Sequence, residues 1–214
     1  MGLFDLFKAN RGTGKGPDQA GGSLDPGTIV IVSGLPRSGT SMMMKMLEAG
    51  GLDPLIDNVR TADDDNPKGY YEFERVKALD KGDTEWLPMA QGKVVKVISA
   101  LLKYLPSEYR YKVIFMRRRL EENIESQKKM LVNRGEDTEA VSDEELGALL
   151  EKHLRQIDTF LNSQPNIDLL YVPYHEMVQD PHANISMVNA FLGNALDAGK
   201  MTEVVDAKLY RNRA

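Results

Sequence analysis

Apolar and polar positions define two kinds of segment along this chain. Short apolar runs rich in Val and Ile predict strands at 28–33, 93–98, 112–116 and 167–172. Between them, apolar residues recur every three or four positions and predict helices at 40–49, 74–87, 120–134, 142–161 and 183–192. Strands that alternate with helices predict a parallel sheet covered on both faces. The expected fold class is therefore α/β, with three layers and a central parallel sheet flanked by helices.

The helix expected at 142–161 has the clearest pattern. Its apolar residues fall on one stripe, made of Leu146, Leu149, Leu150, Leu154, Ile157 and Leu161. We expect this stripe to face the core, because the charged residues lie elsewhere on the helix. Ser142, followed three residues later by Glu145, predicts a capping box at the start of the helix.

Residues 1–27 differ from the rest of the chain. Gly, Asp, Pro and Ser dominate 9–27, which predicts a flexible N-terminal segment before one folded domain at 28–214. The first eight residues lack the basic lead and long apolar stretch of a signal peptide. The Pro-, Gly- and Asp-rich stretch at 53–72 predicts a long loop, and loops of that length in a compact domain are often functional.

Composition narrows the functional classes. A formal net charge of −5 argues against a protein that coats nucleic acid, because neutralising phosphates requires concentrated Lys and Arg. The absence of Cys excludes disulfides and thiolate nucleophiles, and the three histidines are too scattered to predict a metal site. No apolar run approaches the roughly 20 residues that span a bilayer, so we expect a cytoplasmic protein without stable membrane insertion. No pattern predicts the oligomeric state.

The turn after the first strand is the strongest chemical signal. Residues 34–41 read Gly-Leu-Pro-Arg-Ser-Gly-Thr-Ser and lie between an apolar strand and a helical pattern. Such a strand–loop–helix points backbone N–H groups and a helix N-terminus at one place, which makes an anion site. Thr40 stands where NTP-hydrolysing phosphate loops carry Lys, and the cation is instead Arg37. The loop therefore predicts a phosphate cradle that is not built for the γ-phosphate of ATP.

This loop and two later segments resemble the sulfotransferase family that uses 3′-phosphoadenosine 5′-phosphosulfate (PAPS), as in its small bacterial members. The sequence Pro-Arg-Ser-Gly-Thr at 36–40 is similar to the family's 5′-phosphosulfate loop. Arg118, just after a strand, and Ser126, eight residues later, are similar to the element that holds the donor's 3′-phosphate. The chain departs from the usual pattern after the arginine, where it has Arg119-Leu120 in place of Asp-Pro.

A third segment is similar to the family's late strand and helix. It reads Tyr-Val-Pro-Tyr-His-Glu-Met at 171–177, then Asp-Pro at 180–181 and Phe-Leu-Gly at 191–193. The resemblance therefore spans about 28–193, with its three parts in the expected order. It implies a P-loop NTPase-like fold that binds PAPS as a co-substrate.

The resemblance also implies which residues hold the donor. The 5′-phosphate is expected against the loop residues Pro36, Arg37, Ser38, Gly39, Thr40 and Ser41. Arg37 is expected to neutralise the bridge and sulfate oxygens, and Arg118 and Ser126 to bind the 3′-phosphate. Arg117 and Arg119 remain alternatives to Arg118, which we prefer because only its spacing to Ser126 matches. A solvated basic face is the competing interpretation of this segment.

The acceptor side is less well defined. The family's histidine base follows a lysine in the second strand, but here Lys96 is followed by Val-Ile-Ser, so no histidine can be carried over. Lys96 is expected near the sulfate, although a lysine extending from a strand edge has the same pattern. Glu72 is our candidate for the general base, ahead of Glu74 and Asp64. The competing interpretation is that these acids only solvate a loop or begin a helix.

Together these features predict transfer of a sulfuryl group from PAPS to a hydroxyl or amine, without a metal. The acceptor stays open among carbohydrates, lipids, phenols and other small molecules, and peptide tyrosines. A P-loop small-molecule or nucleotide kinase is one alternative, disfavoured by Thr40 in place of the loop lysine. A non-catalytic nucleotide-binding regulatory module is the other, supported by the missing histidine and the short chain.

Overall fold

A computed structural model describes residues 24–57, 71–133 and 142–205 of the chain. Its sheet has four strands: β1 (Thr28–Gly34), β2 (Val94–Lys96), β3 (Arg110–Arg117) and β4 (Ile167–Pro173). All neighbours are parallel and the order is β2-β1-β3-β4. The predicted parallel α/β arrangement is confirmed. Because the strands are parallel, the turns that follow all of them lie along one edge of the sheet, the carboxyl edge.

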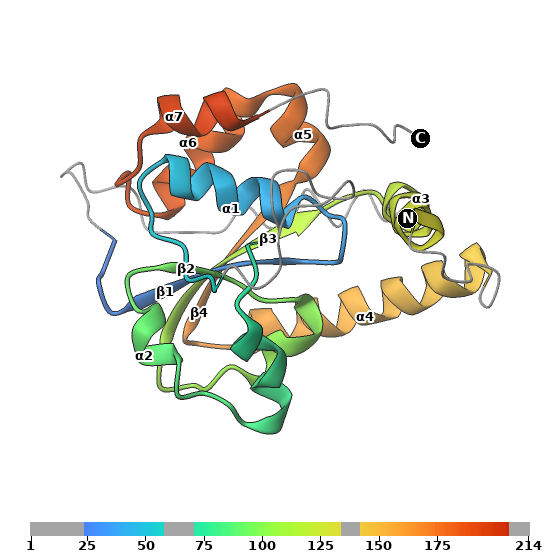
Figure 1. The fold of residues 1–214 in the computed structure, drawn as a ribbon, viewed down its shortest axis with the longest axis horizontal. Coiled ribbons are helices and arrows are strands. Elements are labelled where there is room, and N and C mark those ends of the chain that lie inside the picture. Colours follow the sequence, from blue (N-terminus) through green and yellow to red (C-terminus); the bar gives the residue numbers. More distant parts are fainter. Residues whose placement is uncertain (1–23, 58–70, 134–141, 206–214) are drawn as a thin grey trace.

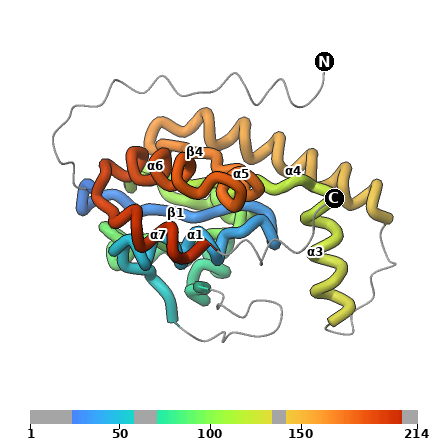
Figure 2. The backbone as a smooth tube through the Cα atoms, turned by 90° about the horizontal axis from the view of Figure 1, so that it is seen from above, coloured from blue at the N-terminus to red at the C-terminus, as the bar shows by residue number. Residues whose placement is uncertain are grey.

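Helices cover both faces of the sheet (Figure 1). One face carries α1 (Thr40–Ala49), α5 (Tyr174–Gln179), α6 (Pro181–Phe191) and α7 (Ala198–Val204). The other carries η2 (Glu74–Lys81), α2 (Leu87–Ala90), η3 (Ser99–Tyr104) and α4 (Asp143–Ser163). Helix α3 (Leu120–Asn133) lies at one end of the molecule, and α4 projects toward it (Figures 1 and 2).

Alternation along the strands supplies the two halves of the core. In β1, Ile29 and Ile31 pack toward η2 and α4, whereas Val30 and Val32 pack toward α1. All four side chains are fully buried, as is usual for a parallel sheet with both faces covered.

Two predicted elements are shorter than expected. The helix predicted at 74–87 is the 3₁₀-helix η2, which stops at Gly82 in a left-handed conformation (φ 85°). A separate short helix, α2, begins at Leu87 with a proline in its first turn. Of the strand predicted at 93–98, only Val94–Lys96 form a strand, β2. Helices η3, α5 and α7 were not predicted.

Helix α4 confirms one prediction and corrects another. Ser142 Oγ accepts a hydrogen bond from the Glu145 N–H, and the Glu145 side chain accepts one from the Ser142 N–H, so the capping box is present. The apolar stripe, however, is only partly buried. Ile157 and Leu161 lie in the core, but Leu149 is 60% exposed. The sheet is too short to cover the N-terminal half of this helix, which extends beyond its carboxyl edge.

Candidate functional site

The phosphate loop joins β1 to α1 at the carboxyl edge. Two of its residues have left-handed backbones, Arg37 with φ 68° and Gly39 with φ 95°. This conformation turns successive N–H groups toward one side, as in an anion-binding nest. At Gly34, a Cβ atom would meet Ser38 Oγ at 2.4 Å and the Met116 carbonyl oxygen at 2.7 Å, so only glycine fits there. Helix α1 then begins at Thr40, and no described side chain caps it.

Ser38 gives a direct indication that this loop receives a polar group. Its side chain is buried, and Oγ has no hydrogen-bond partner among the described residues. A buried hydroxyl without a partner is unfavourable, and a bound oxyanion beside the loop would offer it an acceptor. The loop's conformation and this hydroxyl therefore fit a phosphate group.

Helix α3 and Arg118, two residues before it, are tied to the phosphate loop by three hydrogen bonds. Asn123 Nδ2 donates to the Pro36 carbonyl oxygen, and Arg118 Nη1 donates to the Arg37 carbonyl oxygen, each over 3.0 Å. Arg37 Nε donates to Ser126 Oγ, also over 3.0 Å. The structure thus brings Arg37, Arg118 and Ser126 together, although they are separated by up to 89 positions in sequence.

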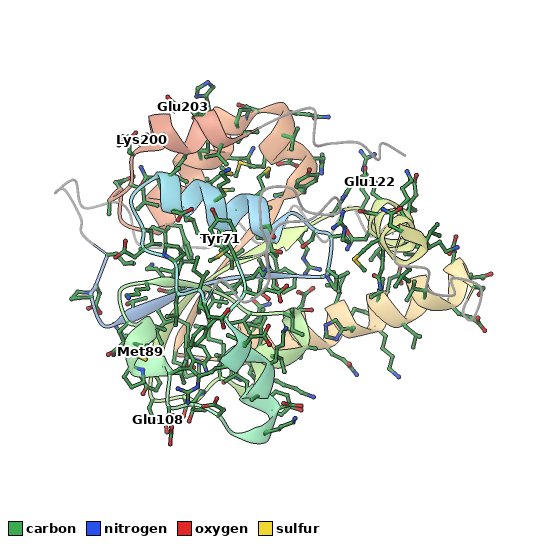
Figure 3. The ribbon with its side chains drawn as sticks, in the orientation of Figure 1. Tyr71, Met89, Glu108, Glu122, Lys200 and Glu203 are labelled. Carbon is green, nitrogen blue, oxygen red and sulfur yellow. The ribbon has the colours of Figure 1, made fainter. Side chains whose placement is uncertain are left out.

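Arg118 is oriented by two buried neighbours that the sequence analysis did not identify. Its Nε donates to Glu122 Oε2 over 2.9 Å, and the Glu122 side chain is completely buried on α3, where Figure 3 labels it. Its guanidinium also lies 4.9 Å from the centre of the Tyr174 ring. Burial raises the pKa of Tyr174, and the nearby Arg118 charge opposes that rise. Arg118 lies four residues before Glu122, at the start of the helix predicted at 120–134, and this spacing could have revealed the first contact.

Tyr174 also contacts the phosphate loop. A Cβ atom on Gly39 would lie 2.4 Å from Tyr174 Cδ2, so the ring packs directly against the backbone of this glycine. Tyr174 is the first residue of α5, directly after β4. It connects the third segment of the resemblance to the loop, although no sequence pattern assigned it a role.

The neighbouring arginines point elsewhere. Arg117 is on the opposite face of the sheet, paired with Asp158 of α4 and stacked 4.7 Å from the Tyr171 ring. Arg119 is half-exposed, and its nearest carboxylate in the described structure is Glu122, 3.9 Å away. Among the described residues, only Arg118 of the three arginines donates a hydrogen bond to the phosphate loop.

On the other side of β1, the structure brings Lys96 and Glu72 together. Lys96 is the last residue of β2 and is level with Val32, two residues before the end of β1. Its Nζ lies 4.0 Å from Glu72 Oε1, and Lys77 Nζ lies 3.4 Å from Glu72 Oε2. Both Lys96 and Glu72 are largely buried side chains.

The other candidate bases are placed differently. Glu74 is more exposed and forms an ion pair with Lys77 at 2.6 Å. Asp64 lies outside the described residues. Tyr71, the residue before Glu72, donates a hydrogen bond to Glu48 of α1 over 2.5 Å and lies below that helix in Figure 3. Burial and the Glu48 carboxylate raise the pKa of Tyr71. This contact fixes one end of the segment that carries Glu72.

A serine–histidine contact next to Lys96 was also not predicted. Ser99 Oγ lies 2.8 Å from His153 Nε2 and joins the start of η3 to the middle of α4. Burial, together with the charge of Lys103, lowers the pKa of His153 and so favours the neutral imidazole. Ser99 is itself buried. The pair therefore holds α4 against the end of β2.

The described part of the chain lacks two general features. It contains no group of three or more His, Asp or Glu side chains arranged to hold a metal ion. Among its helices, none combines the length and the apolar character needed to cross a bilayer.

Comparisons with known proteins agree with this arrangement. Residues 28–212 match the family model described as "Sulfotransferase domain". No curated protein matches the sequence. The fold is similar to a sulfotransferase domain from the curacin biosynthetic pathway, with 18% identity, 86% of this chain and 79% of that chain covered, and a TM-score of 0.50.

Two further solved structures are similar. Retinol dehydratase, in complex with androsterone and the inactive cofactor PAP, is 15% identical, with 88% of this chain and 67% of that chain covered and a TM-score of 0.50. The sulfotransferase domain of an olefin synthase from Synechococcus PCC 7002 is 17% identical, with 92% of this chain and 86% of that chain covered and a TM-score of 0.48. The predicted P-loop-like α/β fold is thereby confirmed.

Proposed function

The chain belongs to the sulfotransferase family, and on that premise we propose that it transfers a sulfuryl group from PAPS to a hydroxyl or amine of an acceptor. The observation that carries the proposal is the contact between the two phosphate elements. Arg37 in the loop donates to Ser126 on α3, and Arg118 donates to the carbonyl of Arg37. A donor with both a 5′-phosphosulfate and a 3′-phosphate needs two anion sites held at a fixed separation.

Different residues at the carboxyl edge of the sheet bind different groups of this donor. The backbone N–H groups of 39–41 and the Thr40 and Ser41 hydroxyls bind the 5′-phosphate, and Pro36 shapes the turn. The Ser38 N–H instead donates to the Leu35 carbonyl oxygen over 3.2 Å. Arg37 neutralises charge on the bridge and sulfate oxygens. Arg118 and Ser126 bind the 3′-phosphate, the group that separates this donor from ordinary adenine nucleotides. Glu122 and Tyr174 are positioning residues for Arg118.

The transfer itself needs a base and charge stabilisation. The acceptor oxygen forms a bond to sulfur while the bond from sulfur to the donor's phosphate oxygen breaks, and the acceptor proton passes to the Glu72 carboxylate. Negative charge that develops on the leaving oxygen is stabilised by Arg37 and Lys96. The contact between Lys96 and Glu72 supports this division of roles, because it places a cation and a carboxylate together at the end of β2. None of these roles calls for a metal.

Calorimetric titration with 3′,5′-adenosine bisphosphate, the spent donor, tests the proposal. We expect micromolar binding without metal, at least a hundredfold weaker in Arg118→Ala, and no comparable binding of ATP or ADP with magnesium. Arg119→Ala is the matched control, since Arg119 is half-exposed and should change the affinity by less than about threefold.

The alternatives give distinct results in the same experiment. Preference for magnesium–ATP would overturn the proposal in favour of a kinase. Bisphosphate binding without sulfuryl transfer to any acceptor would favour a nucleotide-binding regulatory module.

A further inference from the structure

Glu72 lies in a short irregular segment, so its place in the site depends on contacts from elsewhere in the chain. Residues 71–73 belong to no helix or strand, and η2 begins at Glu74. Tyr71, directly before Glu72, has a left-handed backbone with φ 54°, which is unfavourable for a residue with a large side chain. Local sequence preference therefore does not explain the conformation of this segment.

The two lysines near Glu72 constrain its position only loosely. Lys77 Nζ lies 3.4 Å from Glu72 Oε2, but the Lys77 side chain is 57% exposed and also pairs with Glu74 at 2.6 Å. The ion pair between Lys96 Nζ and Glu72 Oε1 is long, at 4.0 Å. An exposed ion pair and a long one define no strict geometry, so the backbone that carries Glu72 needs a stronger constraint.

Asp57 reaches this segment along the side of β2 that faces away from β1. Pro54 pairs in parallel with Val94 of β2, and the Leu55 N–H donates to the Val94 carbonyl oxygen over 2.8 Å. This short pairing makes the stretch that begins at Pro54 run beside β2 in the same direction. Asp57, three residues beyond Pro54, therefore lies beside the end of β2 at the carboxyl edge, where Lys96 is the last strand residue.

Asp57 makes two hydrogen bonds to the backbone around Glu72. Its N–H donates to the Glu72 carbonyl oxygen over 3.3 Å, and its Oδ2 accepts from the Glu74 N–H over 2.6 Å. The second bond caps η2, because Phe73, at the N-cap position, makes no side-chain bond to the helix. A carboxylate that accepts from a backbone N–H forms a strong, charge-assisted hydrogen bond with a defined direction. Tyr71 anchors the segment before Glu72, and Asp57 anchors it after Glu72.

We propose that Asp57 is a positioning residue for Glu72. Its carboxylate fixes the backbone at the start of η2, so that the Glu72 carboxylate faces Lys96 instead of solvent. The proposal rests on the proposed function, in which Glu72 accepts the acceptor's proton. A displacement of about 1 Å in a reacting group can lower a rate by about two orders of magnitude, so this cap has a consequence for turnover that an ordinary helix cap lacks.

The test compares Asp57→Ala and Asp57→Asn with the wild type, each as the full chain. Asp57→Ala removes the carboxylate but keeps the backbone N–H, whereas Asp57→Asn keeps an oxygen that can accept from the Glu74 N–H. Asp197→Ala is the matched control, because Asp197 caps α7 by accepting from the Lys200 N–H over 3.1 Å. Helix α7 packs on the opposite face of the sheet from η2, so this variant should lose a similar amount of thermal stability without moving Glu72.

Crystal structures of the variants measure the position of Glu72 directly. In Asp57→Ala, we expect the Glu72 carboxylate to turn away from Lys96, so that the separation exceeds the present 4.0 Å. Asp57→Asn and Asp197→Ala should leave this contact unchanged. A Glu72 carboxylate that stays beside Lys96 in Asp57→Ala would overturn the proposal, whatever the activity of that variant.

Turnover of PAPS, with 2-naphthol or water as the acceptor, gives the second readout at a temperature where every variant is folded. We expect kcat to fall about tenfold or more in Asp57→Ala and to stay within about threefold of the wild type in Asp57→Asn and Asp197→Ala. The affinity for 3′,5′-adenosine bisphosphate should stay within about twofold in all three, because the donor contacts lie on the other side of β1.

A double-mutant cycle separates positioning from a general loss of structure. In a Glu72→Gln background, Asp57→Ala should cause little further loss of kcat, because Asp57 acts through Glu72. A further loss as large as in the wild-type background would overturn the proposal. Full activity of Glu72→Gln alone would instead reject Glu72 as the base in the proposed function, and the crystal structures would still decide whether Asp57 positions it.

Discussion

The donor half of the candidate site is held by hydrogen bonds between the phosphate loop and the segment that runs from Arg118 into α3. The acceptor half contains ion pairs that join Glu72, just before η2, to Lys96 of β2 and Lys77 of η2. In the donor half, Arg37, Arg118 and Asn123 each bond across from one segment to the other. In the acceptor half, Glu72 is held by Lys77 and Lys96 at 3.4 and 4.0 Å. Hydrogen bonds with fixed geometry define positions more strictly than ion pairs of this length.

This difference suggests how the two halves serve the reaction. The donor is the same molecule in every turnover, so a rigid and specific cradle is favourable for it. The acceptor half requires only a proton acceptor, a cation and a surface that fits one class of molecule. We therefore expect substitutions in the donor half to change nucleotide affinity, and substitutions in the acceptor half to change turnover or acceptor affinity.

Replacing Glu72 by Gln should have the largest effect. If Glu72 accepts the acceptor's proton, kcat falls by a factor of about 10² to 10⁴, because a neutral amide cannot act as the base. The affinity for 3′,5′-adenosine bisphosphate should stay within about twofold of the wild type, since the donor contacts are on the other side of β1. Steady-state sulfuryl transfer and calorimetry measure the two quantities.

Glu74→Gln is the control for this prediction. Glu74 also pairs with Lys77 but is more exposed, so its variant should keep most of the activity. Unchanged kcat in Glu72→Gln would show that the proton goes elsewhere. Weaker nucleotide binding in Glu72→Gln would show that the two halves are not independent.

A second, smaller effect is expected from Gly39→Ala in the donor half. The new Cβ would lie 2.4 Å from Tyr174 Cδ2, so the ring must move away from the loop and from Arg118. We expect nucleotide affinity to fall more than about tenfold and the free energy of unfolding to fall by about 2–4 kcal/mol. Calorimetry and urea unfolding measure these changes.

Gly82→Ala separates backbone strain from the clash. Gly82 has a similar left-handed backbone, with φ 85°, but no described atom lies within 4 Å of where its Cβ would be. Its variant should lose stability by about 1 kcal/mol and bind the nucleotide normally. If both variants behave alike, the contact between Gly39 and Tyr174 does not hold the cradle.

Much of the donor half could be predicted from sequence because its residues lie in two short segments with fixed spacing. The residues at 34–41 are consecutive and form one turn. Arg118 follows a predicted strand, and Ser126 lies eight residues later on the helix that comes next. The alternation of side chains along β3 also distinguishes Arg117 from Arg118. Tyr111, Val113 and Phe115 face α4, so Arg117 is expected on that face and Arg118 on the other.

The acceptor half could not be predicted in the same way, because its contacts join segments without a shared pattern. Ser99 and His153 meet at 2.8 Å across 54 positions, and neither belongs to a motif. The stripe on α4 predicted burial correctly only where the sheet is long enough to cover it. Periodicity shows which side of a helix is apolar, but the length of the neighbouring sheet decides how much of that side is buried.

Asp158→Asn should have the smallest effect on the site. It tests whether Arg117 only stabilises the fold through its ion pair with Asp158 or also binds the donor nucleotide. Asp158 pairs with Arg117 and accepts a hydrogen bond from the Tyr171 hydroxyl over 2.9 Å. Weakening the pair should lower the free energy of unfolding by about 1–2 kcal/mol, a modest value because Asp158 is partly exposed. Nucleotide affinity should not change, because Arg117 faces away from the loop.

Tyr171 gives this variant a spectroscopic readout. Burial first, and then the Asp158 charge, raise the pKa of Tyr171 to about 12, so between pH 10 and 12 the folded protein retains a proton that the unfolded chain loses. Stability should therefore decline as pH rises through this range. Without the Asp158 charge, the Tyr171 pKa should fall while burial keeps it above 10, and phenolate absorbance should appear at lower pH. If nucleotide affinity fell together with this pKa, Arg117 would have to be counted among the donor-binding residues.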